Sequence, residues 1–234
     1  MSDAKNALDL AAIDHDGAVR EAAAALTTRG QLLGGVLAAV GALAAGFAVP
    51  AAAAAGELEA RDRSVLTYAL SLEYLQDAFY TEAERLGALS GAVASAAGAL
   101  GQVERAHVHA FRELLGSGAP KRPRFDFKGT TEDELAFLRT AVALEELSVG
   151  AYAGQATNIR SPEVLQAAMG IHSVEARHAA WLRRLMDMRP TVASLDRPRG
   201  RRSVVGAITA KGFVVAEPEL PKTHRHRVAP RFTG

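Results

Sequence analysis

Two Glu-x-x-His pairs carry the residue types in this chain that could do chemistry: Glu104 with His107, and Glu175 with His178. Residues three apart on an α-helix lie on the same face, so each pair would present a carboxylate and an imidazole side by side. Donors of these two kinds bind divalent transition metals. One such pair is common on exposed helix faces, but two pairs with matching upstream residues favour a metal site over surface ion pairing.

Each pair follows a Glu that has a Tyr seven positions later. This Glu precedes its pair by 31 residues in one copy and by 30 in the other, which predicts two copies of one helical hairpin. Four bundled helices would bring four carboxylates and two imidazoles together, the ligand set of a carboxylate-bridged two-metal centre. The predicted metal ligands are Glu73, Glu104, His107, Glu145, Glu175 and His178, with Tyr80 and Tyr152 as candidates for contacts just outside them.

Charge balance supports two ions in such a site. Four buried carboxylates are costly unless neutralised, and two divalent cations would neutralise them while neutral imidazoles complete the coordination. Glu73 and Glu145 would be terminal or bridging ligands. Glu145 is preferred to its neighbour Glu146, because it shares a face with an apolar stripe at helical spacing. The stripe consists of Leu138, Val142, Val149 and Tyr152.

Composition narrows the chemistry further. The 234 residues are 49% hydrophobic and 23% charged, which fits a globular protein with an apolar segment attached. The net charge of +1 does not suggest a nucleic-acid partner. No cysteine is present, so any metal must use oxygen and nitrogen ligands, which suit iron, manganese and, less well, zinc. Iron is the expected metal, with manganese as the alternative.

The elements that must position these residues are four long helices, and no segment alternates like a strand. The first two are predicted over residues 59–86 and 92–115. The third is predicted to begin near Thr131, and the fourth to run from Ser161 to a stop at Pro190. Thr131 and Glu134 would form a capping box, and Ser161 with Pro162 would open the last helix. Two short connections make two antiparallel hairpins. The 15-residue linker 116–130 can extend to about 50 Å, enough to run past a helix of about 36 Å and form a crossover.

Three segments are expected: residues 1–56, a bundle over 57–189 and a basic, proline-containing extension over 190–234. Residues 30–56 contain no charged residue. They are either a cleaved export signal, a retained membrane anchor or an Ala/Gly-rich helix packed on the bundle. Residues 28–33 resemble a degenerate twin-arginine signal with Gly30 in place of the second arginine, which favours an exported or envelope location over a cytoplasmic one. The C-terminal extension is expected to be an irregular tail in which residues 204–215 dock as a short helix or turn.

Residues 64–188 resemble the bacterial ferritin-like domain family, including its desiccation-related proteins. The matching stretches are Leu72–Tyr80, Glu104–His107, Glu145–Tyr152 and Glu175–Ala179, and residues 195–213 are similar to that family's C-terminal extension. The resemblance implies an all-α, ferritin-like four-helix bundle that carries two metal ions. Many relatives carry a twin-arginine signal.

Two functions follow as alternatives. The first is a two-metal protein that oxidises ferrous iron or consumes O2 or peroxide in stress defence, which would make it an oxidoreductase. The second is a non-catalytic metal-binding or structural protein of the cell envelope with a stress-protective role. Metal ions are the expected partners, residues 30–56 would make any membrane contact, and a homo-oligomer is compatible with the sequence.

Overall fold

The computed structural model describes residues 58–215, and within them the fold is all-α, as predicted. Four long helices form the body: α5 (Ala60–Leu86), α6 (Gly91–Leu115), α7 (Glu134–Gln155) and α8 (Pro162–Leu185). A shorter helix, α9 (Arg201–Lys211), follows. Two 3-10 turns, η1 (Gly116–Gly118) and η2 (Ala156–Asn158), end α6 and α7. Two short strands, β1 (Arg124–Phe125) and β2 (Val214–Val215), pair antiparallel.

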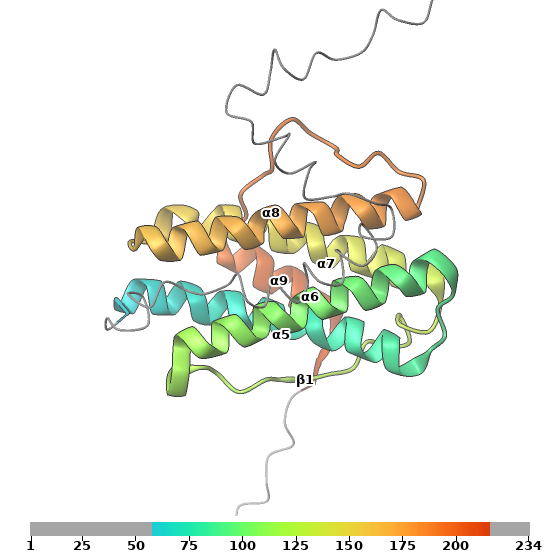
Figure 1. The fold of residues 1–234 in the computed structure, drawn as a ribbon, viewed down its shortest axis with the longest axis horizontal. Coiled ribbons are helices and arrows are strands. Elements are labelled where there is room, and N and C mark those ends of the chain that lie inside the picture. The colour runs from blue at the N-terminus through green and yellow to red at the C-terminus, as the bar shows by residue number, and fades with distance from the viewer. Residues whose placement is uncertain (1–57, 216–234) are drawn as a thin grey trace, which may run out of the picture. The chain divides into compact units, whose positions relative to one another are not determined.

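The four helices are arranged as two hairpins. Helices α5 and α6 form the first hairpin and α7 with α8 the second, and the hairpins meet through contacts of α5 with α7 and of α6 with α8. The segment between α6 and α7 runs along the side of the first hairpin, so it is the crossover that the sequence predicted (Figure 1). The crossover also carries β1, whose partner strand β2 comes from the C-terminal segment.

The helix ends are partly as predicted. Ser161 is the N-cap of α8, where its hydroxyl accepts from the amide of Val164 and Pro162 takes the first position. The prediction of a capping box formed by Thr131 and Glu134 is wrong. Asp133 is the N-cap of α7, and the buried Thr131 donates to Glu82 instead. A carboxylate accepts from a backbone amide more strongly than a hydroxyl does, which favours the cap two residues later.

Helix α8 ends at Leu185, before the predicted stop at Pro190. Asp187 has a φ of 55°, in the left-handed region, so the chain leaves the helix before the proline is reached. Within residues 58–215, no helix combines the length and the apolarity needed to cross a membrane. The predicted signal or anchor at residues 30–56 lies outside the described residues.

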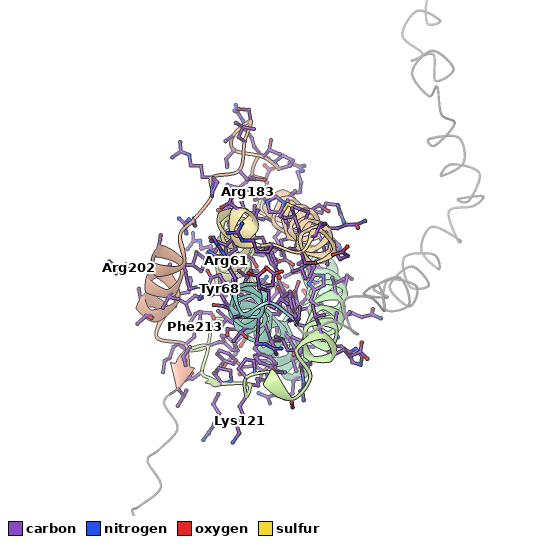
Figure 2. The ribbon with its side chains drawn as sticks, turned by 90° about the vertical axis from the view of Figure 1, so that its left-hand side faces the viewer. Arg61, Tyr68, Lys121, Arg183, Arg202 and Phe213 are labelled. Carbon is purple, nitrogen blue, oxygen red and sulfur yellow. The ribbon has the colours of Figure 1, made fainter. Side chains whose placement is uncertain are left out.

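An aromatic cluster joins α5, α7, the crossover and the C-terminal segment. Phe79 stacks on Phe137 with ring centroids 5.2 Å apart, and Phe127 and Phe213 extend the cluster. Further along, Val204 of α9 is fully buried in the groove between α5 and α7. Figure 2 shows α9 lying against the side of the bundle, with the labelled Arg202 directed away from it. Residues 204–215 were expected to dock as a short helix or turn, and docking is confirmed, although the helix begins earlier, at Arg201, and ends at Lys211 before β2.

The internal repeat extends beyond the predicted ligands to the helix ends. Asp62, in the first turn of α5, accepts hydrogen bonds from the backbone amides of Arg160 and Ser161 at 2.7 and 2.8 Å, just before α8. At the equivalent place in the second hairpin, Glu134 of α7 accepts from the amide and hydroxyl of Ser90, the N-cap of α6, at 2.9 and 2.7 Å. Each hairpin therefore caps a helix of the other, which fixes the two copies in register across the core.

Candidate metal centre

The structure brings all six predicted ligand residues together in the middle of the bundle. Each of the four helices contributes a carboxylate, and α6 and α8 each add the imidazole three residues later. The four carboxylates have no exposed surface, and His107 and His178 are 2% and 6% exposed. The neighbour that sequence reasoning set aside, Glu146, lies half-exposed and forms an ion pair with Arg183 at 3.0 Å.

The donor atoms form two overlapping groups, and within each group they all lie within 4.8 Å of one another. We call them half-site 1 and half-site 2. Half-site 1 consists of Glu73, Glu104, His107 and Glu175. Half-site 2 consists of Glu104, Glu145, Glu175 and His178. The carboxylates of the two Glu-x-x-His pairs thus belong to both groups, whereas Glu73 and Glu145 each belong to one. The sequence left this distinction open.

Both imidazoles face carboxylates rather than solvent. Nδ1 of His107 lies 3.1 Å from Oε2 of Glu73 and 3.3 Å from Oε1 of Glu175. Nδ1 of His178 lies 3.0 Å from Oε1 of Glu104 and 3.5 Å from Oε2 of Glu145. The Nδ1 atom of each imidazole therefore points at the volume that the carboxylates surround.

Two tyrosines support the unshared carboxylates from the opposite hairpin. The hydroxyl of Tyr80 on α5 donates to Oε1 of Glu145 on α7, and that of Tyr152 on α7 donates to Oε1 of Glu73 on α5. Both tyrosines are buried. Burial and the neighbouring carboxylates raise the pKa of each hydroxyl well above its ordinary value, so both stay protonated as donors.

Sequence reasoning missed Gln76. Its side-chain amide donates to Oε2 of Glu145 at 2.8 Å and to Oε2 of Glu175 at 3.0 Å. The available signal was its place three residues after Glu73, on the same helix face. Two other residues near the pairs lie outside the site. His109 is exposed and faces Glu113, and Trp181, three residues after His178, is 43% exposed.

Burial governs the charge of the cluster. It raises the pKa of Glu73 to about 7 against the opposing effect of His107, and it raises that of Glu175 well above the ordinary value with help from Glu104 and Glu145. Burial alone would lower the pKa of His107 and His178, but the carboxylates beside them raise both well above the ordinary value. The same two imidazoles overcome burial at Glu104 and lower its pKa.

Several buried carboxylate oxygens of the centre lack a well-oriented hydrogen bond. Among the described residues, both oxygens of Glu104 and Oε1 of Glu175 lie 3.0–3.4 Å from the imidazole nitrogens of His107 and His178 but make no well-oriented hydrogen bond. Buried polar atoms are normally paired, because an unpaired one costs about 1–3 kcal/mol. These oxygens belong to the two carboxylates shared by both half-sites, which is where ligands to two neighbouring ions are needed. The residues present therefore fit a two-ion centre.

A comparison with models of protein families agrees with this fold. The family model described as a ferritin-like domain matches residues 61–188, more than half of the chain. The chain belongs to the ferritin-like domain family, so the all-α ferritin-like fold and the family predicted from the sequence are confirmed, whereas the desiccation-related type stays a prediction. The comparison with curated proteins finds no match. The buried cluster of carboxylates and imidazoles is compatible with metal binding in such a domain.

Proposed function

We propose that this protein binds two divalent metal ions in the bundle core, iron foremost with manganese as the alternative, and oxidises ferrous iron or consumes O2 or peroxide. The observation that carries the proposal is the pair of overlapping half-sites, each with three carboxylates and one imidazole, all buried. Bound side by side, two redox-active ions supply electrons to O2 or peroxide. In this proposal Glu104 and Glu175 serve both ions, and Glu73 with His107 and Glu145 with His178 serve one each.

The electrostatics of the cluster support an exchange of protons for metal ions. With the pKa values of Glu73, Glu175, His107 and His178 raised, the metal-free core is neutralised by about four protons. Two divalent cations carry the same charge. Metal ligands must be deprotonated, so binding would release these protons and leave four carboxylates against four positive charges. The buried centre then stays close to neutral in both states.

The remaining residues hold the ligands and exclude water. Tyr80 and Tyr152 fix the unshared carboxylates by donating to one oxygen of each, and the other oxygen is left facing the imidazole of its half-site. Phe79 and Phe137 pack against the ring of Tyr80, with centroids 5.5 and 6.0 Å away, and the four carboxylates have no exposed surface. A dry and preorganised site of this kind strengthens the electrostatic interactions of bound ions.

The test measures metal content and turnover in one series of proteins. Full-length protein is stripped with chelator, given two equivalents of Fe2+ without oxygen, and then mixed with O2 or with peroxide. We expect two bound ions per chain, loss of the oxidant and formation of ferric iron in the protein. The neighbouring residues 145 and 146 supply a matched pair of variants: Glu145→Gln should lose metal and turnover, whereas Glu146→Gln should keep both.

The outcomes separate the competing functions. Two bound ions without consumption of either oxidant would reject the catalytic proposal and favour a structural metal-binding role. Metal binding would be rejected altogether if the wild type bound neither iron nor manganese and its melting temperature did not change when these ions were added. Equal losses in Glu145→Gln and Glu146→Gln would show that the buried cluster is not the site.

A further inference from the structure

The two half-sites are related by the internal repeat, and one position breaks that relation. Residues 72 apart correspond on α5 and α7, so Glu73 matches Glu145 and Tyr80 matches Tyr152. The same offset pairs Gln76 with Ser148. Both are buried, at 2% and 1% exposure, and both lie three residues after the unshared carboxylate of their helix. The repeat therefore places a long amide in one copy and a short hydroxyl in the other.

The long amide acts on half-site 2. Gln76 donates to Oε2 of Glu145 at 2.8 Å, while Tyr80 donates to Oε1 of the same carboxylate. Both oxygens of Glu145 are thus fixed by neutral donors before any ion arrives. A carboxylate oxygen has two lone pairs, so it can accept an amide hydrogen and still bind a cation. Gln76 also donates to Oε2 of Glu175, at 3.0 Å.

Half-site 1 has no equivalent support. Within residues 58–215, the hydroxyl oxygen of Ser148 makes no hydrogen bond, although it is buried. Glu73 is held by Tyr152 at Oε1, while its Oε2 lies 3.1 Å from Nδ1 of His107. That contact lies within the half-site itself and must be replaced when His107 binds an ion. Glu73 is therefore fixed from outside the centre at one oxygen, and Glu145 at two.

We propose that Gln76 is a positioning residue that makes the two half-sites unequal, so that the first divalent ion binds at half-site 2 and the second at half-site 1. This inference rests on the proposed metal-binding function. Hydrogen bonds that orient metal ligands contribute about 10- to 100-fold to affinity. A ligand held at both oxygens loses less conformational freedom on binding than one held at a single oxygen. The preference for half-site 2 is accordingly expected to be about tenfold or more.

Limited loading with Mn2+ tests the order directly. Crystals of the full chain with one equivalent of Mn2+ give the occupancy of each half-site from manganese anomalous scattering. We expect half-site 2 to dominate in the wild type and the two occupancies to be nearly equal in Gln76→Ser. The exchange variant Gln76→Ser/Ser148→Gln keeps the same side chains in the core, and it should move the preference to half-site 1. A residue that only stabilised the bundle would leave the occupancy ratio unchanged.

A titration in solution gives the same information without crystals. His107→Ala leaves half-site 2 intact, and His178→Ala leaves half-site 1 intact. We expect Mn2+ to bind the first variant about tenfold or more tightly than the second. Adding Gln76→Ser should weaken binding mainly in the His107→Ala background. Circular dichroism of each metal-free variant verifies that the bundle is folded.

Each result has a defined meaning. Equal occupancy in the wild type, a preference for half-site 1, or an unchanged preference in Gln76→Ser would overturn the role of Gln76 and leave two-metal binding standing. No Mn2+ at either half-site of the wild type would overturn the inference, and the metal-binding function itself is rejected only when Fe2+ is not bound either.

Discussion

Tyr152 on α7 donates a hydrogen bond to the carboxylate of Glu73 on α5, and so supports half-site 1 from the opposite hairpin. The hydroxyl is buried and remains protonated because burial and Glu73 raise its pKa. This contact is the only support that the structure gives Glu73 from outside the candidate ligands, within the residues it describes. The tyrosine should therefore matter for both stability and metal affinity.

We expect Tyr152→Phe to destabilise the metal-free protein by about 1–3 kcal/mol, because it removes one donor from a buried carboxylate. Mn2+ affinity should fall as well, and mainly at half-site 1. Tyr68→Phe is the matched control: Tyr68 is buried, but its hydroxyl makes no hydrogen bond among the described residues. Urea unfolding and Mn2+ titration compare the two variants. Equal effects would mean that the Tyr152 hydroxyl has no particular role.

Metal-free protein should lose stability as the pH rises through neutrality. The pKa of Glu73 is raised from 4.5 to about 7 in the folded state, so folding is favoured while this group is protonated. Its contribution is fully present below about pH 4.5 and is lost as the pH rises to about 7, on the order of 3 kcal/mol. The raised pKa values of Glu175, His107 and His178 act in the same direction.

Urea unfolding of chelated protein between pH 5 and pH 8 measures this dependence, where the unfolded carboxylates are already ionised. Glu73→Gln should flatten the curve, because the amide does not titrate. Stability that rises across this interval in the wild type would contradict the assigned pKa directions.

Metal binding should release about four protons when two Mn2+ ions bind near pH 6. The protons come from two carboxylic acids and two imidazolium groups whose pKa values are raised in the metal-free protein. Calorimetry in two buffers of different ionisation enthalpy counts them. Mn2+ binding with no proton release would show that the metal-free cluster is not neutralised by protons.

The double variant His107→Ala/His178→Ala should lose most of its bound metal, since each half-site loses its only nitrogen ligand. It should also be less stable than the wild type when both are loaded, because bound metal stabilises the folded state. His109→Ala is the control, since this histidine is exposed and outside the cluster. Equal metal content and equal melting temperature in the double variant and the wild type would contradict the two-metal centre.

Periodicity predicted the parts of the site that depend on helix faces. A spacing of three or seven residues determines which side chains share a face, and an apolar stripe placed Glu145 rather than Glu146 toward the core. The sequence did not indicate which carboxylates are shared, because this depends on how the hairpins are rotated and shifted against each other. Glutamine is common on helices, so Gln76 gave no distinct signal before Glu145 and Glu175 were seen beside it.

The misjudged features depend on long-range or competing contacts. Thr131 was expected to cap α7, but its side chain is buried and donates to Glu82. Asp133 caps the helix instead. Strands β1 and β2 are two residues each and pair across about 90 residues of chain, so no local alternation could reveal them. The end of α8 at Leu185 depends on a left-handed residue at Asp187, which sequence statistics allow but do not require.

The reciprocal caps at Asp62 and Glu134 have a consequence for how such a centre can change over generations. Two separate copies of one hairpin, assembled with twofold symmetry, would carry identical half-sites, and every substitution would alter both at once. Joining the copies in one chain keeps the mutual capping that holds them in register. It also lets each copy change alone, as the difference between Gln76 and Ser148 shows. A single chain can therefore hold two half-sites that differ, which a symmetric pair of separate hairpins cannot.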